Sequence, residues 1–471
     1  MKAAKATEGS PARLQAQRGF GLLFGLFLGL TLLKFGNPPI MERWVAAPTD
    51  AYELVLGYPW PIAWAYVLLT VLAIAGLAVA NWRSPAPFWL LLLPLAWLAW
   101  QFLATQFSIS PELSRPTLNH FIACIVCFYL GVFTLGHLDD LGWVGLGLSM
   151  GLMFVIATGF EQHFGGLEAS RHYFYLYLYS SIKNLPPEYL KKLTSTRIFS
   201  TLFYPNALAG ALLLSLPTSI GVVQNARRWL TPAARWFLGM VLALAGLACL
   251  YWSGSKGGWL LALGMAFLTL LKLPLRRTIK LILVGLVLVG GLSGFFCKYS
   301  GFFKKGATSV SARFDYWRAA LATTEAHPVL GTGPGTFAIP YAAIKRPESE
   351  MARLAHNDYL EQASDSGIAG LVLYLALIGG TLTWTWPPGK LEFRNSDPAQ
   401  VAPSGSGQSN THWMHWFVWL GILAWATQSL FEFGLYIPAL AWPAFTFMGF
   451  LLSKLAKGQG QRIASQKQRR S

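Results

Sequence analysis

The stretch GFGLLFGLFLGLTLLKFG, residues 19–36, decides the fold class, because nearly all of its side chains are apolar or absent over the length of a membrane-spanning helix. A hydrocarbon core of about 30 Å is crossed by about 20 apolar residues in a helix. Similar runs recur along the whole chain. We count about twelve of them, at residues 19–36, 60–80, 87–106, 118–136, 141–160, 203–223, 234–252, 255–271, 279–297, 366–386, 413–433 and 436–453.

These runs predict helices rather than the strands of a barrel. Backbone groups in lipid must bond within their own segment or around a closed barrel, and the runs lack the alternation of barrel strands. The composition agrees, because 54% of the 471 residues are hydrophobic and only 12% are charged, which is more apolar surface than a soluble fold hides. We predict an all-α, polytopic integral membrane protein, with residues 1–471 forming a single domain of about twelve transmembrane helices.

Short basic segments set the orientation of the chain. They are the N-terminal tail, residues 83–87, 225–235 and 272–280, and the basic tail 454–471. With an even number of spans they all fall on the side of the two termini, and an excess of Lys and Arg marks the cytoplasmic side. The first run resembles a signal peptide, but no small-residue cleavage site follows promptly, so we predict an uncleaved span.

The net charge of +17 raises the alternative of nucleic-acid binding. That function needs the positive residues gathered on one soluble domain, whereas here they are scattered between the apolar runs. We therefore expect membrane lipids, and no nucleic acid, around this protein.

Two long loops fall on the outer side, residues 161–202 and residues 298–365. The first is rich in Tyr and Phe, which is typical of a segment at the level of the lipid headgroups, so we expect an interfacial segment there. The second loop, residues 298–365, is longer than a simple connection between two helices requires. Within it, residues 310–327 predict an amphipathic helix. The glycines of residues 328–337 predict a tight turn, because no strand precedes them as a dinucleotide site requires.

Two other features carry no site in our interpretation. Residues 387–412 contain a Pro-, Gly- and Ser-rich stretch and predict a flexible cytoplasmic linker. Cys124 and Cys127 lie three apart inside an apolar run. Without further ligands nearby, we interpret them as small hydrophobic residues. We expect no metal and no cofactor.

A polar cluster stands just before the tenth run. The stretch ARLAHNDYLEQ, residues 352–362, holds His356, Asn357, Asp358 and Glu361. Three more polar segments share its side of the membrane. Together these segments contain Arg197 before Pro205 and Asn206; Ser255, Lys256 and Gly257; and Arg313, Trp317, Pro328, Gly331 and Gly333 before Ala355, His356 and Asn357.

The order of these motifs resembles that of the O-antigen ligase and O-antigen polymerase superfamily of bacterial envelope enzymes. The resemblance covers roughly residues 195–385 and extends loosely to the number of spans. One position departs from the pattern, because Lys256 stands where the family usually has Arg. The ammonium group of lysine is a single point of charge, whereas the guanidinium group of arginine binds two oxygens at once. Lysine can nevertheless hold a phosphate.

The resemblance implies transfer of a glycan from an undecaprenyl diphosphate carrier to an acceptor hydroxyl, at the periplasmic face of the bacterial inner membrane. It also implies a helical arrangement like that of the GT-C glycosyltransferases. The acceptor is left open between a lipid A core sugar, a growing glycan and a protein hydroxyl. Ligase, polysaccharide polymerase and protein O-oligosaccharyltransferase share this framework, and the ligase leads by resemblance alone.

The chemistry assigns roles to the charged residues. A glycosyl diphosphate leaves with negative charge that fixed cations stabilise, and we expect Arg197, Lys256 and Arg313 to bind it. The acceptor hydroxyl must lose a proton, for which His356 is the candidate general base. Asn357 or Asp358 would cap the next helix, and Asp358 or Glu361 would orient the imidazole. We predict a metal-independent single displacement that inverts the anomeric centre.

Simpler readings of the same residues exist. A His beside Asn and Asp at a helix start is commonly a capping or surface residue, and Arg197 is at a place where long side chains anchor a span. Lys256 could end a helix, and Arg313 could pair with Asp315 or Glu325. The competing class of protein is a lipid or polysaccharide transporter. The spans lack an evident pair of Gly- or Pro-broken helices with intramembrane acids, which weakens that alternative.

Overall fold

The computed structural model describes residues 11–56, 59–138, 141–173, 194–202, 204–227, 229–304, 308–347, 349–387, 389 and 408–468, and within these ranges it contains helices and no strands. The all-α prediction is therefore confirmed. The helical elements in chain order are α1 (Pro11–Lys34), η1 (Pro39–Trp44), α2 (Ala51–Leu56), α3 (Ile62–Val79), α4 (Phe88–Gln106), α5 (Pro111–Phe133), η2 (Leu135–His137), α6 (Gly142–Glu161), η3 (Gln162–Gly166), α7 (Leu167–Tyr173), η6 (Ser200–Leu202), α9 (Pro205–Asn225), α10 (Pro232–Ser253), α11 (Lys256–Lys272), α12 (Arg277–Gly285), η7 (Leu286–Gly290), α13 (Gly291–Lys304), α14 (Thr308–Ala326), α15 (Ala338–Ile344), α16 (Asp358–Trp384), α17 (Gln408–Gln428), η9 (Gly434–Tyr436) and α18 (Pro438–Gln468).

The apolar runs of the sequence lie on these helices. In the described part of the chain, nine helical stretches are long and apolar enough to cross a membrane. The three remaining runs, 255–271, 413–433 and 436–453, lie largely on α11, α17 and α18. A multi-pass membrane protein is therefore the architecture, as predicted.

The connections between helices gather at two opposite ends of the bundle. At one end, Ile109 donates its backbone N–H to the carbonyl of Thr332 at 3.0 Å, which joins the α4–α5 turn to the long loop after α14. At the other end, Asn81 donates to the carbonyl of Phe133 at 2.8 Å. The first end, which holds the polar cluster around His356, is called the site end below.

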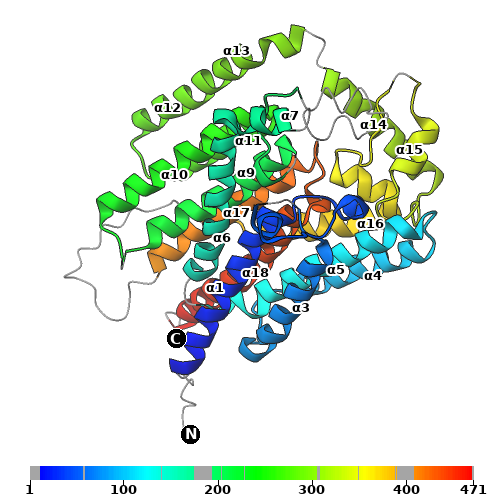
Figure 1. Ribbon diagram of the computed structural model, residues 1–471. Coiled ribbons are helices and arrows are strands. Elements are labelled where there is room, and N and C mark those ends of the chain that lie inside the picture. The colour runs from blue at the N-terminus through cyan, green and yellow to red at the C-terminus, as the bar shows by residue number, and fades with distance from the viewer. Residues whose placement is uncertain are drawn as a thin grey trace.

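Small residues let the central helices approach closely. A Cβ atom placed on Gly151 of α6 would lie 2.4 Å from the Cα atom of Gly29 of α1. The same holds where α5 meets α18, because a Cβ on Gly131 would lie 2.3 Å from the carbonyl oxygen of Thr446. Such contacts are typical of helices that pack in lipid, where van der Waals contact drives association. Figure 1 shows α1, α6 and α18 together at the centre of the molecule.

The helix α16 is broken at Gly367, which has φ 72° and ψ −178°. The turn after α14 fills the break. Thr332 and Gly333 donate their backbone N–H groups to the carbonyls of Ser364 and Asp365, at 3.0 and 2.8 Å. A break in a buried helix frees polar backbone groups that need new partners. The predicted tight turn is therefore present, and it completes the hydrogen bonding of a broken helix.

The sequence showed no evident pair of Gly- or Pro-broken helices with intramembrane acids, and α16 is one helix of this kind. Glu361 and Asp365 precede the break and have no exposed surface. A second break lies in the apolar stretch Gly142–Ala169, where Phe164 and Gly165 leave the helical conformation. The acid that precedes it, Glu161, is exposed, so the described residues do not combine two breaks with two sets of buried acids, as the repeats of a transporter would.

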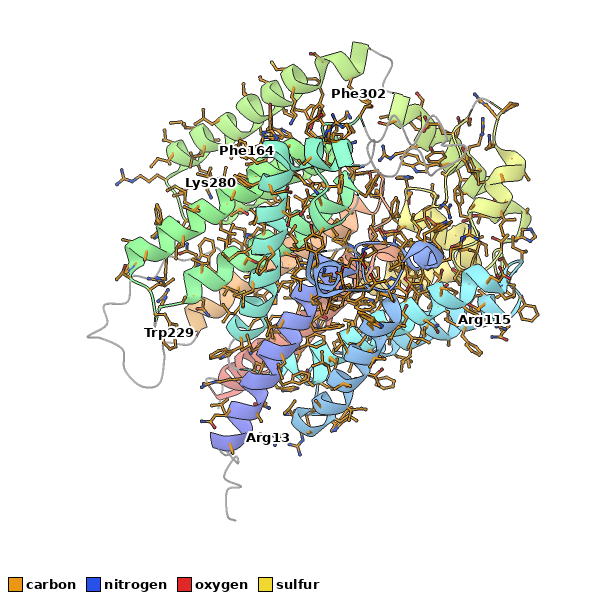
Figure 2. All side chains as sticks on the ribbon, viewed as in Figure 1. Arg13, Arg115, Phe164, Trp229, Lys280 and Phe302 are labelled. Carbon is orange, nitrogen blue, oxygen red and sulfur yellow. The ribbon has the colours of Figure 1, made fainter. Side chains whose placement is uncertain are left out.

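The stretch formed by α12, η7 and α13 lies at the edge of the molecule (Figure 1). Only 6% of its apolar window is buried. Figure 2 shows Lys280 and Phe302 towards its two ends. All three parts of this stretch contact α11. Because little of its surface is buried there, most of its apolar side chains are available to lipid.

The predicted loops are partly described. The loop 298–365 contains a helix at the expected place, α14, and it is shorter than expected because α13 continues to Lys304 and α16 begins at Asp358. The expected amphipathic pattern is not found in α14, because the apolar residues Phe314 and Leu321 are exposed. The loop 161–202 begins with η3 and α7. The expected interfacial segment falls mainly on residues 174–193, and most of the linker 387–412 falls on residues 390–407; both lie outside the described residues.

Candidate functional site

His356 occupies the last turn of chain before α16. Asn357 caps this helix, because its side-chain oxygen accepts hydrogen bonds from the backbone N–H groups of Tyr359 and Leu360 at 3.0 and 3.1 Å. Asn357 thus performs the capping predicted for it or Asp358. His356 itself has φ 52°, in the left-handed region that few residues other than glycine adopt. Such backbone strain is frequent at functional sites.

The imidazole of His356 faces the carboxylate of Glu432, with Nδ1 3.3 Å from Oε2. Glu432 is 5% exposed and lies in the connection between α17 and η9. It forms an ion pair with Arg313 and accepts hydrogen bonds from Asn206 at 2.6 Å and from Tyr204 at 3.1 Å. The two carboxylate oxygens of Glu432 therefore face four polar partners: Arg313 and Asn206 at Oε1, and Tyr204 and His356 at Oε2.

These donors decide the charge of Glu432. Burial alone would raise the pKa of its carboxyl group, but the hydrogen bond and charge of His356 and the charge of Arg313 outweigh burial and hold that pKa below its ordinary value. The group is thus a carboxylate at neutral pH. A neutral imidazole beside a carboxylate places its proton on the facing nitrogen, Nδ1, which leaves the lone pair on Nε2.

Aromatic rings fix the plane of the imidazole. The ring of Phe433 lies 4.8 Å away at 76°, and the ring of Tyr316 lies 5.7 Å away at 27°. The Nε2 atom forms no hydrogen bond with any residue that the structure describes, and 21% of the side chain is exposed. The arrangement thus holds a basic nitrogen in a fixed direction and leaves it accessible.

Arg197 connects this pocket to a cavity. Its Nε atom donates to the carbonyl of Ser253 at 2.7 Å, and its Nη2 atom donates to the side-chain oxygen of Asn206 at 2.9 Å. Asn206 in turn donates to Glu432. A continuous chain of hydrogen bonds therefore runs from Arg197 through Asn206 and Glu432 to His356.

The cavity has a volume of about 590 Å³ and opens at the site end. Four cations are among its described lining residues: Arg171, Arg197, Lys256 and Lys298. Among the lining residues that the structure describes, Glu168 is the one carboxylate, and it is paired with Arg171 at 2.7 Å. Aromatic side chains complete the wall. The ammonium group of Lys256 lies 5.2 Å from the ring centre of Tyr299, and His163 stacks on Trp252 at 3.9 Å. The cavity is therefore suited to an anion.

The structure brings together two of the three predicted diphosphate ligands. Arg197 and Lys256 both line the cavity, as the sequence motifs indicated. Arg313 does not line it. Its guanidinium group donates to the carbonyl of Phe431 at 3.0 Å, to the carbonyl of Ser309 at 3.3 Å, and to Glu432. These contacts make Arg313 a positioning residue for Glu432.

Asp358 and Glu361 differ from their expected role. Their carboxylates have no exposed surface, and neither faces the imidazole. Asp358 accepts from the backbone N–H of Leu435 at 2.8 Å, and Glu361 accepts from that of Ala355 at 2.9 Å. Glu361 thus holds the residue before His356, and Asp358 joins the start of α16 to η9. Glu432 takes the place beside the ring.

Sequence reasoning missed Glu432, Lys298 and Arg171. Glu432 was counted within the apolar run 413–433, although α17 ends at Gln428. As the one acid of the stretch SLFEFGLYIP, residues 429–438, it carried a signal that a scan for isolated charges would have found. Among the residues that the structure describes, no three His, Cys, Asp or Glu side chains are grouped as a metal site requires.

A comparison with protein families agrees with this site. Residues 238–375 match the family model described as O-antigen ligase. The match supports the O-antigen ligase and polymerase superfamily, as the motifs predicted. It includes Lys256, Arg313 and His356, whereas Arg197 and Glu432 lie outside it. No curated protein matches the chain significantly.

Proposed function

We propose that this chain, with an O-antigen ligase domain over residues 238–375, transfers an oligo- or polysaccharide from an undecaprenyl diphosphate carrier to an acceptor hydroxyl. The observation that supports the proposal best is the chain of hydrogen bonds between His356 and Arg197. It joins a potential general base to the wall of a cavity that suits a diphosphate.

His356 activates the acceptor in this proposal. The acceptor oxygen attacks the anomeric carbon of the donor while its proton passes to Nε2 of His356. The imidazolium that forms is stabilised by the carboxylate of Glu432, 3.3 Å from Nδ1. Arg313 and Asn206 hold that carboxylate in place. This is the role that a carboxylate plays behind the histidine of other nucleophile-activating sites.

The cations of the cavity act on the leaving group. The bond between the anomeric carbon and the diphosphate oxygen breaks, and the electron pair stays on the diphosphate. Arg197 and Lys256 stabilise this charge without donating a proton to it. One displacement inverts the anomeric configuration, and no step requires a metal ion.

The lipid part of the donor approaches from the side. The α12–α13 stretch contributes Lys298 to the cavity, and its apolar surface faces away from the protein. A lipid carrier in the bilayer would reach the cavity along this stretch. The basic segments argue that the termini lie in the cytoplasm and that the site end faces the periplasm of a bacterial inner membrane.

The acceptor class is proposed from the family description. A lipid A core acceptor, and hence a ligase, is favoured because the matching model is described as O-antigen ligase. Polymerization of the glycan and transfer to a protein hydroxyl would use the same base and cations. Transport of the lipid-linked glycan is the competing class, and it gives no role to a base positioned by a carboxylate.

Reconstitution tests the proposal. The full-length protein in proteoliposomes is supplied with an undecaprenyl diphosphate-linked glycan and lipid A core, with EDTA present. A ligase joins the two, a polymerase lengthens the lipid-linked glycan, and an O-oligosaccharyltransferase needs an added protein acceptor. Movement of the donor across the membrane without any new glycosidic bond would refute the transferase and support the transporter.

A further inference from the structure

Two arginines and a tryptophan form a second cationic feature at the site end. The guanidinium carbon of Arg43 lies 4.1 Å from the ring centre of Trp44, and that of Arg353 lies 4.0 Å from the same ring centre. The two charges are therefore at most 8.1 Å apart, the sum of the two distances. Arg43 and Trp44 come from η1, and Arg353 comes from the segment before α16. We call these three residues the Arg43–Arg353 clamp.

The clamp carries charge that the described part of the chain does not neutralise. Neither guanidinium group forms an ion pair or hydrogen bond with a described residue. The adjacent acid, Glu42, is used elsewhere, because its carboxylate accepts from the backbone N–H of Ile62 at 2.7 Å. By contrast, Arg318 and Arg346 on the loop both contact Asp315, at 3.0 and 3.9 Å.

Like charges this close repel one another, because their separation is no more than about one Debye length at physiological ionic strength. A bound anion would remove the repulsion. Guanidinium groups bind phosphate oxygens in pairs, through forked donors that match their geometry. Stacking on one indole fixes the planes of both groups before an anion arrives.

The clamp also lies close to the general base. Arg353 precedes His356 by three residues, so their Cα atoms are separated by at most about 11 Å. The neighbours of Arg353 are anchored, since Ala352 is 7% exposed and Leu354 is 4% exposed. None of the three clamp residues is among the described lining of the cation-lined cavity. The clamp is thus a separate anion site within reach of a substrate held at His356.

We propose that the Arg43–Arg353 clamp binds a phosphoryl group carried by the acceptor saccharide. The inference rests on the proposed function, which assigns the cavity to the donor diphosphate and so leaves a second anion site for the acceptor. It makes the protein selective for phosphorylated acceptors. The headgroup of an anionic phospholipid offers the same chemistry, and the experiment separates the two sources.

The test is a binding measurement without donor. Full-length protein in phosphatidylcholine nanodiscs is titrated with lipid A core, and with the same material after removal of its phosphates by hydrofluoric acid. We expect the wild-type protein to bind the phosphorylated form about tenfold more tightly. The double variant Arg43→Gln/Arg353→Gln should bind both forms equally. Arg346→Gln, an exposed arginine that has a carboxylate partner, is the matched control and should keep the preference.

Three outcomes would overturn the proposal: equal binding of both acceptors by the wild-type protein, a preference that survives in the double variant, or a preference that disappears when phosphatidylglycerol replaces phosphatidylcholine in the discs. The last result would assign the clamp to membrane headgroups. Because both clamp arginines are exposed, the variants should fold, and Arg43→Lys/Arg353→Lys keeps the charge while removing the forks. The proposed function fails separately, if the wild-type protein transfers no glycan while the binding preference remains.

Discussion

Asn206 connects two clusters of charge that differ in how they are balanced. On one side, Arg197 donates to the neutral side chain of Asn206 and to a backbone carbonyl, and it forms no ion pair among the described residues. On the other side, Arg313 is paired with Glu432, and Glu432 also faces His356. The charge of Arg197 is therefore not neutralised by a described residue, whereas the charge of Arg313 is neutralised by a carboxylate.

This difference explains why two arginines with the same expected role have different places. A cation whose own partners are neutral, as those of Arg197 are, keeps its charge available to an anion in the cavity. Arg313 instead helps to keep Glu432 ionised in a buried position, where an unpaired carboxylate would be costly. The cavity and the base pocket thus require opposite partners for the same type of side chain.

The largest expected effect comes from removing the base. His356→Ala should lower the rate of glycan transfer about 10³-fold, because a positioned general base contributes on the order of 10² to 10⁴. Glu432→Gln should lower it somewhat less, since glutamine cannot stabilise the imidazolium as a carboxylate does. Transfer from the lipid-linked donor is measured in proteoliposomes. The control is His327→Ala, an exposed histidine of the same loop, which should be neutral. Normal transfer by His356→Ala would exclude His356 as the base.

Removing a cavity cation should have the next largest effect. Arg197→Gln is expected to lower kcat/KM for the donor about 10²-fold, as the loss of one fixed charge at a leaving group commonly does. Arg115 on α5 provides the control, because it is exposed and does not line the cavity. In Figure 2 it lies far from Phe164, which follows the cavity residue His163 in the chain. If Arg115→Gln and Arg197→Gln lowered kcat/KM alike, the effect would be one of overall charge and the cavity assignment would fail.

The broken helix beneath the base pocket predicts a smaller effect. Gly367→Ala should destabilise the protein by about 2 kcal/mol, because a side chain is strained at this φ and the new Cβ would lie 2.0 Å from the carbonyl oxygen of Val329. Gly379→Ala on the same helix should be neutral, since no atom lies within 4 Å of the position of its Cβ. Thermal unfolding in detergent compares the two. Equal melting temperatures would show that the break is not needed.

Much of this architecture was predictable from the sequence. Apolar runs and basic loops are local patterns, so the helical class, the helix α14 and a cap at Asn357 or Asp358 could be predicted directly. The approach of Arg197 to Lys256 followed from the topology, because both were expected at the outer membrane boundary, and the structure places both in the wall of the cavity.

Contacts between distant segments could not be read in this way. Glu432 is 76 residues from His356, and only the folded bundle brings the connection after α17 beside the start of α16. Glu432 was assigned to a membrane span because the residues on both sides of it in the sequence are apolar. The break at Gly367 was hidden for a similar reason, since glycine in an apolar run is also typical of close helix packing, as at Gly29 and Gly151.

The smallest effect concerns the ionisation of Glu432, and it tests the contrast between the two arginines directly. Because the pKa of this carboxyl group is held below the ordinary value of a glutamate, we expect it to stay ionised at a lower pH than an ordinary glutamate does. The stability gained from its charge is fully present above the unfolded-state pKa and is lost as the pH falls through the lower folded-state pKa. Infrared difference spectra between the protein and its Glu432→Gln variant report the titration.

Arg313→Gln should raise the midpoint of the Glu432 titration, because a cation that favours the carboxylate is lost. Arg197→Gln should raise the midpoint less, because Arg197 forms no direct hydrogen bond or ion pair with Glu432 and is joined to it through Asn206. Equal shifts in the two variants would show that both arginines act on Glu432 alike, and the division between cavity and base pocket would be refuted.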